Sequence, residues 1–122
     1  MKTNIVKANG IEIAHVESEK IIITDVQSAV DFIATVRYET SCDRVILNKD
    51  AITEDFFELS TRIAGEVLQK FINYYMKIAI LGDFSIYKSK SLKDFIYESN
   101  KGKNIFFLST IEQAVEKLSI DN

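Results

Sequence analysis

A chain of 122 residues is the right size for one compact domain, and 47% hydrophobic with 27% charged residues is typical of globular proteins. Fifteen Lys and Arg residues against eighteen Asp and Glu give a net charge of -3, which disfavours nucleic acid as a partner. Apolar runs far shorter than the roughly 20 residues of a membrane helix, and no signal-peptide core after Met1, predict a cytoplasmic protein without membrane contact.

The predicted fold begins with a β-hairpin. Residues 5–9 and 11–16 have strand-like patterns and flank the dipeptide Asn9-Gly10. Both central positions of a type I′ turn need positive φ, which Asn and Gly adopt readily. The sequence therefore predicts two antiparallel strands at the start of the chain.

A helix follows the short apolar run at residues 21–23. Thr24-Asp25 supplies a capping side chain, and the spacing of apolar residues predicts a helix that ends near residues 38–39. Its buried face holds Val26, Ala29, Val30 and Ile33. The run at residues 45–47 is predicted as the next buried strand.

The widest apolar face belongs to a helix in the middle of the chain. Thr53 is predicted to cap a short turn that holds Phe56 and Phe57. Apolar residues then recur at helical spacing, namely Ile63, Ala64, Val67, Leu68, Phe71, Ile72 and Tyr75. If Arg62 faces outward from this helix, it is placed to pair with Glu58 or Glu66, each four residues away.

Two further strands and helices complete the pattern. The apolar runs 78–81 and 105–108 are predicted as buried strands. Ser91 with Asp94, and Ser109 with Glu112, predict capping boxes for the two helices. Their buried faces hold Leu92, Phe95, Ile96, Ile111, Ala114, Val115 and Leu118.

This order, ββαβαβαβα, predicts a single α/β domain over residues 1–122 with a mixed sheet. Strands that alternate with helices pair in parallel through right-handed crossovers, whereas the first hairpin adds an antiparallel strand. We expect the strands centred near Ile46, Ile80 and Phe106 to end along a common rim of the sheet.

Single occurrences of two reactive residue types limit the possible chemistry. Cys42 is the only cysteine, so it forms no internal disulfide, and we interpret it as structural in a reducing compartment. His15, the only histidine, alternates with Ile11 and Ile13, which favours a partly buried histidine bonded to a neighbour. We predict no catalytic residues, no metal and no cofactor. Given the acidic balance of the chain, Tyr74, Tyr75 and Tyr97 are predicted to seal the edges of the core rather than to stack on nucleic-acid bases.

Two segments carry a family resemblance. They are Phe56-Phe57-Glu58-Leu59 continuing through Phe71, and Gly82-Asp83-Phe84-Ser85 continuing through Gly102. They resemble the hallmark blocks of a bacterial family catalogued as domain of unknown function 4180. The resemblance covers nearly the whole chain and implies a fold class, but no established activity.

The order of elements is also similar to that of STAS domains, the anti-sigma-factor antagonist fold. That resemblance implies a partner that docks at the start of the helix after the third strand, with a serine there that can be phosphorylated. Here the region holds Ser60, Thr61 and Gly65. Leu59-Ser60-Thr61-Arg62 stands where STAS domains have an Asp-Ser-Ser-Gly-like pattern, so phosphorylation of Ser60 or Thr61 stays open.

Ligands of open α/β sheets gather beyond the carboxyl ends of the parallel strands. Asn48, Asp83, Ser85 and Ser109 are expected there. Asp83 follows a buried strand and Gly82, so it is either a turn former or a ligand-contacting residue. Lys88, Lys90 and Ser91 precede a helix N-terminus, which favours anions, although lysines in a solvated loop are also ordinary.

We predict a non-enzymatic protein-interaction module, regulatory or signalling, because the segment 82–91 is longer than a strand-to-helix connection needs. The predicted partner surface is Ser60, Thr61, Arg62, Asp83, Ser85, Lys88, Lys90 and Ser91. The alternative is a small-molecule or phosphate-handling enzyme that uses Asp83, Ser85 and Lys90. A third possibility is a homo-oligomeric structural unit, which would show a large exposed apolar patch and form a stable homodimer in solution.

Overall fold

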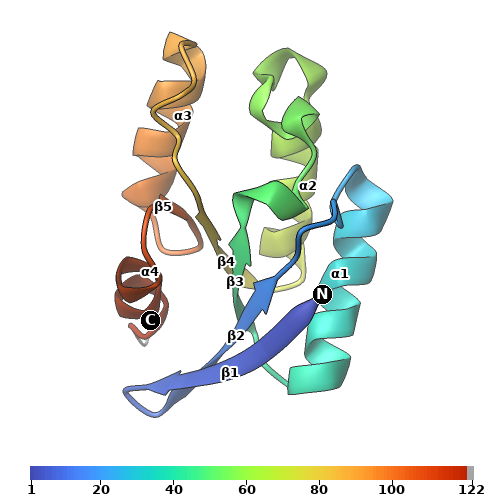
Figure 1. Ribbon diagram of the computed structural model, residues 1–122, viewed down its shortest axis with the longest axis vertical. Coiled ribbons are helices and arrows are strands. Elements are labelled where there is room, and N and C mark those ends of the chain that lie inside the picture. Colours follow the sequence, from blue (N-terminus) through green and yellow to red (C-terminus); the bar gives the residue numbers. More distant parts are fainter. Residues whose placement is uncertain (121–122) are drawn as a thin grey trace.

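The core of the fold is one mixed five-stranded sheet (Figure 1), in a computed structural model that describes residues 1–120. Its strands are β1 (Lys2–Ala8), β2 (Ile11–Glu17), β3 (Arg44–Asn48), β4 (Lys77–Leu81) and β5 (Ile105–Leu108). They lie in sequence order, with β1 antiparallel to β2 and the others parallel. The predicted α/β class, mixed sheet and order of elements are confirmed.

The first hairpin closes through a tight two-residue turn. Asn9 has a φ of 54° and Gly10 a φ of 77°, and Ala8 pairs directly with Ile11. Positive φ at both positions is what the type I′ turn requires. The hairpin predicted from Asn9-Gly10 is therefore confirmed.

Among the described residues, three α-helices cover one face of the sheet, and the fourth covers the other. The helices are α1 (Val26–Thr40), α2 (Ile63–Asn73), α3 (Lys90–Asn100) and α4 (Ile111–Leu118). Because β2 to β5 follow one another across the sheet, crossovers of the same hand put α1, α2 and α3 on the same side. The chain continues past β5 into α4, which packs on the opposite face.

Side-chain alternation along the strands divides the interior into two cores. In β3, Val45 and Leu47 point toward α1 to α3, whereas Ile46 points toward α4. The smaller core consists of Ile13, Ile46, Ala79, Phe106, Ala114 and Leu118, all buried. Strands buried on both faces need continuous apolar runs, which explains why β3, β4 and β5 were recognisable in the sequence.

The helix cap predicted from the sequence is confirmed for α1, whereas the caps predicted for α3 and α4 are wrong. Asp25 accepts a hydrogen bond of 2.9 Å from the Ser28 backbone N–H, which confirms the first cap. The predicted caps Ser91 and Ser109 are wrong. Ser89 caps α3, and Thr110 caps α4 in a capping box with Gln113. Both segments offer several hydroxyl residues close together, so the Ser/Thr-x-x-Glu/Gln pattern leaves the register of the cap ambiguous.

The C-terminal end of α2 also differs from the prediction. The helix stops at Asn73, and Tyr75 has a φ of 56° and an exposed fraction of 84%. Tyr74 and Tyr97 are exposed as well, so the prediction that the three tyrosines seal the core is wrong. A residue with positive φ turns the chain out of the helix, and the apolar spacing did not reveal this turn.

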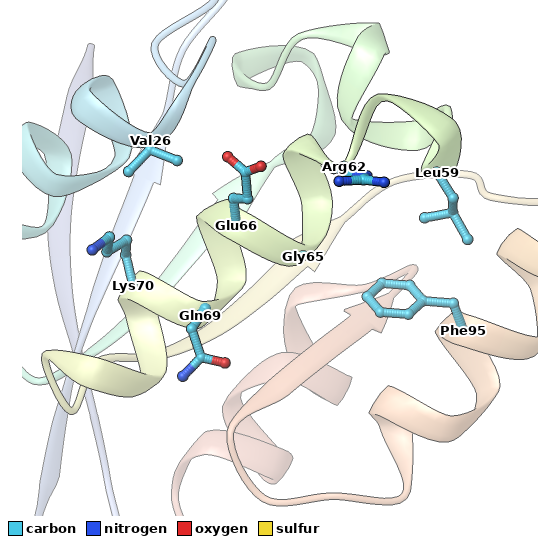
Figure 2. Close-up of a pocket in the computed structure, with 8 residues that line it drawn as sticks. All are labelled: Val26, Leu59, Arg62, Gly65, Glu66, Gln69, Lys70 and Phe95. Atoms are coloured by element: carbon cyan, nitrogen blue, oxygen red, sulfur yellow. The ribbon is translucent and has the colours of Figure 1, made fainter.

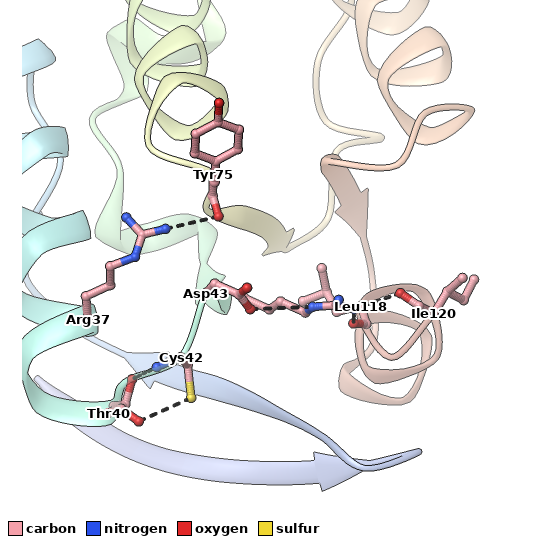
Figure 3. Close-up of polar contacts among 8 residues, drawn as sticks. Arg37, Thr40, Cys42, Asp43, Tyr75, Leu118 and Ile120 are labelled. Carbon is pink, nitrogen blue, oxygen red and sulfur yellow. Dashed lines mark hydrogen bonds and ion pairs between the residues drawn. The ribbon is translucent and has the colours of Figure 1, made fainter. Parts of the chain in front are cut away.

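Polar contacts at the amino ends of the strands join α4 and α1 to the rest of the fold (Figure 3). The buried Arg44 donates hydrogen bonds to the backbone oxygens of Leu118, the last residue of α4, and Ile120, which follows the helix. Arg37 of α1 donates to the Tyr75 oxygen at 3.0 Å. A cation at a helix C-terminus satisfies carbonyls that have no partner in the helix, so Arg44 fastens α4 to the sheet.

Cys42 and His15 occupy structural positions. Cys42 is buried, with its Sγ 3.6 Å from the Thr40 oxygen. His15 is partly buried, and its Nε2 lies 3.6 Å from Oε1 of Glu17. The predicted partial burial of His15 is confirmed, whereas its bond to a neighbour and the structural role of Cys42 stay predictions.

Candidate functional site

The carboxyl ends of the parallel strands form one rim, as predicted. Asn48 pairs with Leu81, and Leu81 pairs with Leu108, so β3, β4 and β5 end side by side. The residues that follow these strands therefore share one edge of the sheet. Ligands of open α/β sheets bind at this edge, so the rim is a candidate site.

Polar side chains at the rim form hydrogen bonds with nearby parts of the chain. The Asn48 side chain accepts from the Ser18 backbone N–H and donates to the Ser18 oxygen. Oδ1 of Asp83 accepts from the Ser85 backbone N–H at 3.0 Å and from its hydroxyl at 2.6 Å, and these bonds hold the pKa of Asp83 below its ordinary range. Two acceptor contacts to a residue two positions later are the geometry of an Asp-initiated turn.

The remaining rim residues of the prediction lie at the start of α3. Lys88, Lys90 and Ser91 are exposed. Lys90 pairs with Asp94 at 2.7 Å, and this hydrogen bond raises the pKa of Lys90. Its ammonium group therefore neutralises a neighbouring carboxylate on the helix surface rather than facing Asp83.

The long connection between β4 and α3 has a packing role. Phe84 packs edge-on against Phe107 at 5.4 Å between ring centroids, and Tyr87 stacks on Phe57 at 5.1 Å. Phe57 also contacts Phe84 at 5.9 Å. The segment 82–89 thus carries two rings down onto the core, which accounts for its length without a ligand.

A polar cluster that the sequence did not predict fixes this connection to the segment after β3. Lys49 Nζ lies 2.8 Å from Oε1 of Glu54, and the Tyr87 hydroxyl donates to Glu54 at 3.0 Å. The same ammonium group sits 5.3 Å from the Phe57 ring centroid and 5.1 Å from that of Tyr87. Lys49 and Tyr87 are 38 positions apart, so only the folded chain brings them together.

The protonation equilibria of this cluster favour the charged pair. Burial by itself would lower the pKa of Lys49, but its contacts with Glu54 and Tyr87 outweigh burial and raise it. The Lys49 hydrogen bond lowers the pKa of Glu54, and burial raises the pKa of Tyr87. A nucleophilic lysine or a general base needs the opposite shifts, so the cluster is suited to fastening the rim and not to proton transfer.

Gly82 provides a test of how tightly this cluster is packed. A Cβ at position 82 would lie 2.7 Å from Cβ of Lys49, the inflexible end of that side chain. We expect Gly82→Ala to lower the free energy of unfolding by about 1–3 kcal/mol, because Lys49 must move away from Glu54. Urea denaturation measures the change, and an unaltered midpoint would contradict the described packing.

The Glu54 bonds predict a pH dependence. The pKa of Glu54 in the folded protein lies below its ordinary value of 4.5. The contribution of Glu54 to the free energy of unfolding is therefore complete above pH 4.5 and is lost as the pH falls through the pKa of the folded protein. We therefore expect Glu54→Gln to flatten the fall of the urea midpoint between about pH 5 and pH 3. Glu12→Gln, at an exposed position on β2, is the matched control, and equal pH profiles for the wild type and Glu54→Gln would contradict the assignment.

A larger hollow lies on the helical face, across α2 (Figure 2). It has a volume of about 730 Å³, whereas two hollows that include Asp83 measure about 450 and 270 Å³. We call it the α2 groove. Its lining residues are Val26, Leu59, Arg62, Gly65, Glu66, Gln69, Lys70 and Phe95. In Figure 2, Val26 and Lys70 lie on one side of α2, and Leu59 and Phe95 lie on the other.

Arg62 borders this groove at the junction of the 3₁₀ turn Leu59–Thr61 with α2. Its φ is 67°, so it precedes the helix instead of lying in it. The conditional prediction of an ion pair with Glu58 or Glu66 is wrong: within residues 1–120, Arg62 forms no ion pair. An i,i+4 pair requires both residues on one helix, which the left-handed backbone of Arg62 prevents.

The eight predicted surface residues separate into two groups. Ser60, Thr61 and Arg62 lie at the start of α2, and the other five lie in or beside the β4–α3 connection. Ser60 is exposed, whereas the Thr61 hydroxyl lies 2.7 Å from the Asp55 oxygen. Of the eight residues, Arg62 alone lines the α2 groove as its lining is given above.

Sequence reasoning named the start of α2 and Arg62 but missed the rest of the α2 groove, although Gly65 was a further signal. Gly65 occupies an exposed position in the first turn of α2, where glycine costs helix stability and an added Cβ would meet nothing within 4 Å. We therefore expect Gly65→Ala to raise the free energy of unfolding by about 0.5–1 kcal/mol, opposite in sign to Gly82→Ala. Thermal denaturation would show it as a higher melting temperature, and a lower one would contradict the open space at Gly65.

Within residues 1–120, no helix combines the length and apolar character that crossing a bilayer requires, and no three His, Cys, Asp or Glu side chains converge on a metal-sized site.

Comparison with known proteins identifies a family and no characterised relative. No curated protein matches the chain. No solved structure matches it either, so the likeness to STAS domains stays a prediction. The family model described as Domain of unknown function (DUF4180) matches residues 8–118. The chain therefore belongs to the DUF4180 family.

Proposed function

We propose that this chain is a non-enzymatic protein-interaction module with a regulatory role in the bacterial cytoplasm, and that the α2 groove binds its partner. The observation that carries the proposal is the groove itself. It combines apolar walls with a cationic side chain that has no ion pair within residues 1–120. Apolar surface with a few polar groups at its border is the usual composition of a protein-binding site.

The state of the rim supports binding over catalysis. Asp83 and Glu54 have lowered pKa values, and that of Lys49 is raised, so each charged form is stabilised. Catalytic acids and bases instead have pKa values moved toward neutrality. The connection 82–89 is also occupied with aromatic packing. A buried free thiol at Cys42 is consistent with a reducing compartment.

Site-specific photo-crosslinking in the native cell tests the proposal. A photo-reactive amino acid is placed at Gln69 in the α2 groove, at Ser85 on the rim, or at Lys117 on α4 as a control. We expect one defined protein adduct from position 69 and none from positions 85 and 117. An adduct between two copies of the chain would make the partner a second copy, and adducts from position 85 alone would contradict the groove as the binding surface.

The enzyme alternative predicts a different result at the rim. If Asp83, Ser85 and Lys90 handle phosphate, then added inorganic phosphate should shift the backbone amide signals of residues 83–91 in NMR spectra. Our proposal predicts no saturable shift there. A saturable shift that Asp83→Asn changes and Glu112→Gln does not would favour the enzyme.

A further inference from the structure

We infer that the α2 groove takes a short acidic and apolar segment of a partner protein, with a carboxylate on Arg62 and an apolar side chain between Leu59 and Phe95. This inference rests on the proposed function and names the chemistry of the partner. Its basis is the charge, the shape and the apolar walls of the groove.

Arg62 supplies the electrostatic part of the argument. Within residues 1–120 its guanidinium forms no ion pair and no side-chain hydrogen bond, although Glu58 and Glu66 are each four residues away. A guanidinium presents a planar array of donors that matches a carboxylate in a two-pronged contact. The fixed φ of 67° holds the residue outside the helix, where its own neighbours on α2 do not reach it.

The groove as a whole is more positive than the rest of the chain. Arg62 and Lys70 oppose the single carboxylate of Glu66, which leaves one net positive charge on a chain whose net charge is -3. Lys70 likewise has no ion pair within the described part of the chain. The N-cap residue Arg62 gives α2 no side-chain cap, although the Thr61 hydroxyl accepts from the Ile63 N–H, so the other amides of the first turn add positive potential at this end. Complementarity therefore favours an acidic partner over a basic one.

The apolar walls specify the second part of the ligand. Leu59 and Phe95 are partly buried and stand on one side of α2, as Figure 2 shows. The Phe95 ring packs against Phe107 of β5 at 6.0 Å, so this wall is held by the core. A rigid apolar wall next to an unpaired guanidinium suits a partner residue with an aliphatic or aromatic side chain beside its carboxylate.

The floor of the groove limits the size of the occupant. Gly65 has no side chain to raise the surface of α2, so a partner backbone can approach the helix closely. A volume of about 730 Å³ lies within the usual range for ligand clefts. We therefore assign the groove to a short segment and not to the flat face of another domain.

Selection from a random 12-residue peptide library displayed on phage tests the inference with the full chain as bait. We expect enriched peptides to pair Asp or Glu with Leu, Ile, Phe or Trp, and to bind with an affinity that falls as salt rises. Arg62→Glu should weaken a selected peptide by about tenfold or more, measured by fluorescence anisotropy. Arg62→Lys, which keeps the charge, should weaken it less.

Two further variants separate binding from folding. Arg62→Gly suits the positive φ at this position, so it should leave the protein folded while it abolishes the carboxylate contact. Gly65→Ala should stabilise the protein and still weaken the peptide, because the added methyl group enters the groove. Unchanged affinity in both variants would overturn the assignment.

The site at which the selected peptides bind shows whether the inference alone fails or the proposed function fails with it. Peptides that shift the NMR signals of Gly65 and Gln69 but lack acidic residues would overturn the inference and leave the groove as the binding surface. Peptides that shift only the rim at residues 83–91, or a selection that enriches no sequence, would contradict the proposed function as well. Enrichment of basic peptides at the groove would reverse the inferred charge of the partner.

Discussion

Replacing Phe107 with alanine should lower the free energy of unfolding by about 3–5 kcal/mol. Phe107 is 3% exposed, and its ring contacts those of Phe56 at 6.3 Å, Phe84 at 5.4 Å and Phe95 at 6.0 Å. The truncation leaves a cavity at the point where α3, β5 and the β4–α3 connection meet. A loss of this size is a large part of the stability of a domain of this length.

The measurement is equilibrium denaturation in urea, monitored by tyrosine fluorescence and circular dichroism. Phe107→Leu keeps most of the buried volume and gives a folded variant if Phe107→Ala is too unstable to measure. Tyr38→Ala, at a position that is 91% exposed, is the surface control and should change stability by less than about 0.5 kcal/mol. A loss below about 1 kcal/mol for Phe107→Ala would mean that the aromatic cluster does not hold the rim.

Arg44→Ala should cost about 2–3 kcal/mol and should act first on α4. The guanidinium is buried and donates to the oxygens of Leu118 and Ile120, the latter at 2.7 Å. Without it, the backbone oxygens of Leu118 and Ile120 lose a charged donor, and the contact to Leu118 is buried. Since α4 has eight residues, its stability depends on such tertiary contacts and not on helix propensity alone.

Hydrogen exchange distinguishes this local effect from general destabilisation. We expect the amides of α4, such as those of Val115 and Leu118, to exchange faster in Arg44→Ala while β3 and β4 keep most of their protection. Asp43→Ala is the matched control: Asp43 is mostly exposed and lies 3.6 Å from the Arg44 Nε, so its removal should cost less than about 1 kcal/mol. Equal loss of protection in α4 and the central strands would contradict the local role.

Features that depend on residue periodicity were predictable from the sequence. The hairpin turn followed from Asn9-Gly10, and the buried strands followed from runs that are apolar at every position. Their common rim then followed from the rule that crossovers join parallel strands. Each inference used a local pattern with one dominant structural solution.

Features with several local solutions were harder to predict. Ser89 and Ser91 both fit the start of α3, and Ser109 and Thr110 both fit the start of α4. The choice depends on which backbone N–H groups the tertiary fold leaves free. The outward turn at Tyr75 likewise carries no glycine to mark its positive φ.

The candidate site was the least predictable part. Its walls come from α1, the 3₁₀ turn Leu59–Thr61, α2 and α3, and Arg62 stands apart from α2 because its backbone leaves the helical conformation. The sequence pointed to the connection after β4, on the grounds of polarity and length, and to the start of α2, through the resemblance to STAS domains. Packing of Phe84 and Tyr87 explains the length of the connection, and the exposed Gly65 is a further sequence feature that marks the groove.

The most direct test of the account is hydrogen exchange of the chain with and without the protein partner identified by crosslinking. The account predicts new protection at Arg62, over residues 63–70 of α2 and near Phe95 of α3, where the groove lies. Protection confined to residues 83–91, with α2 unchanged, would contradict it.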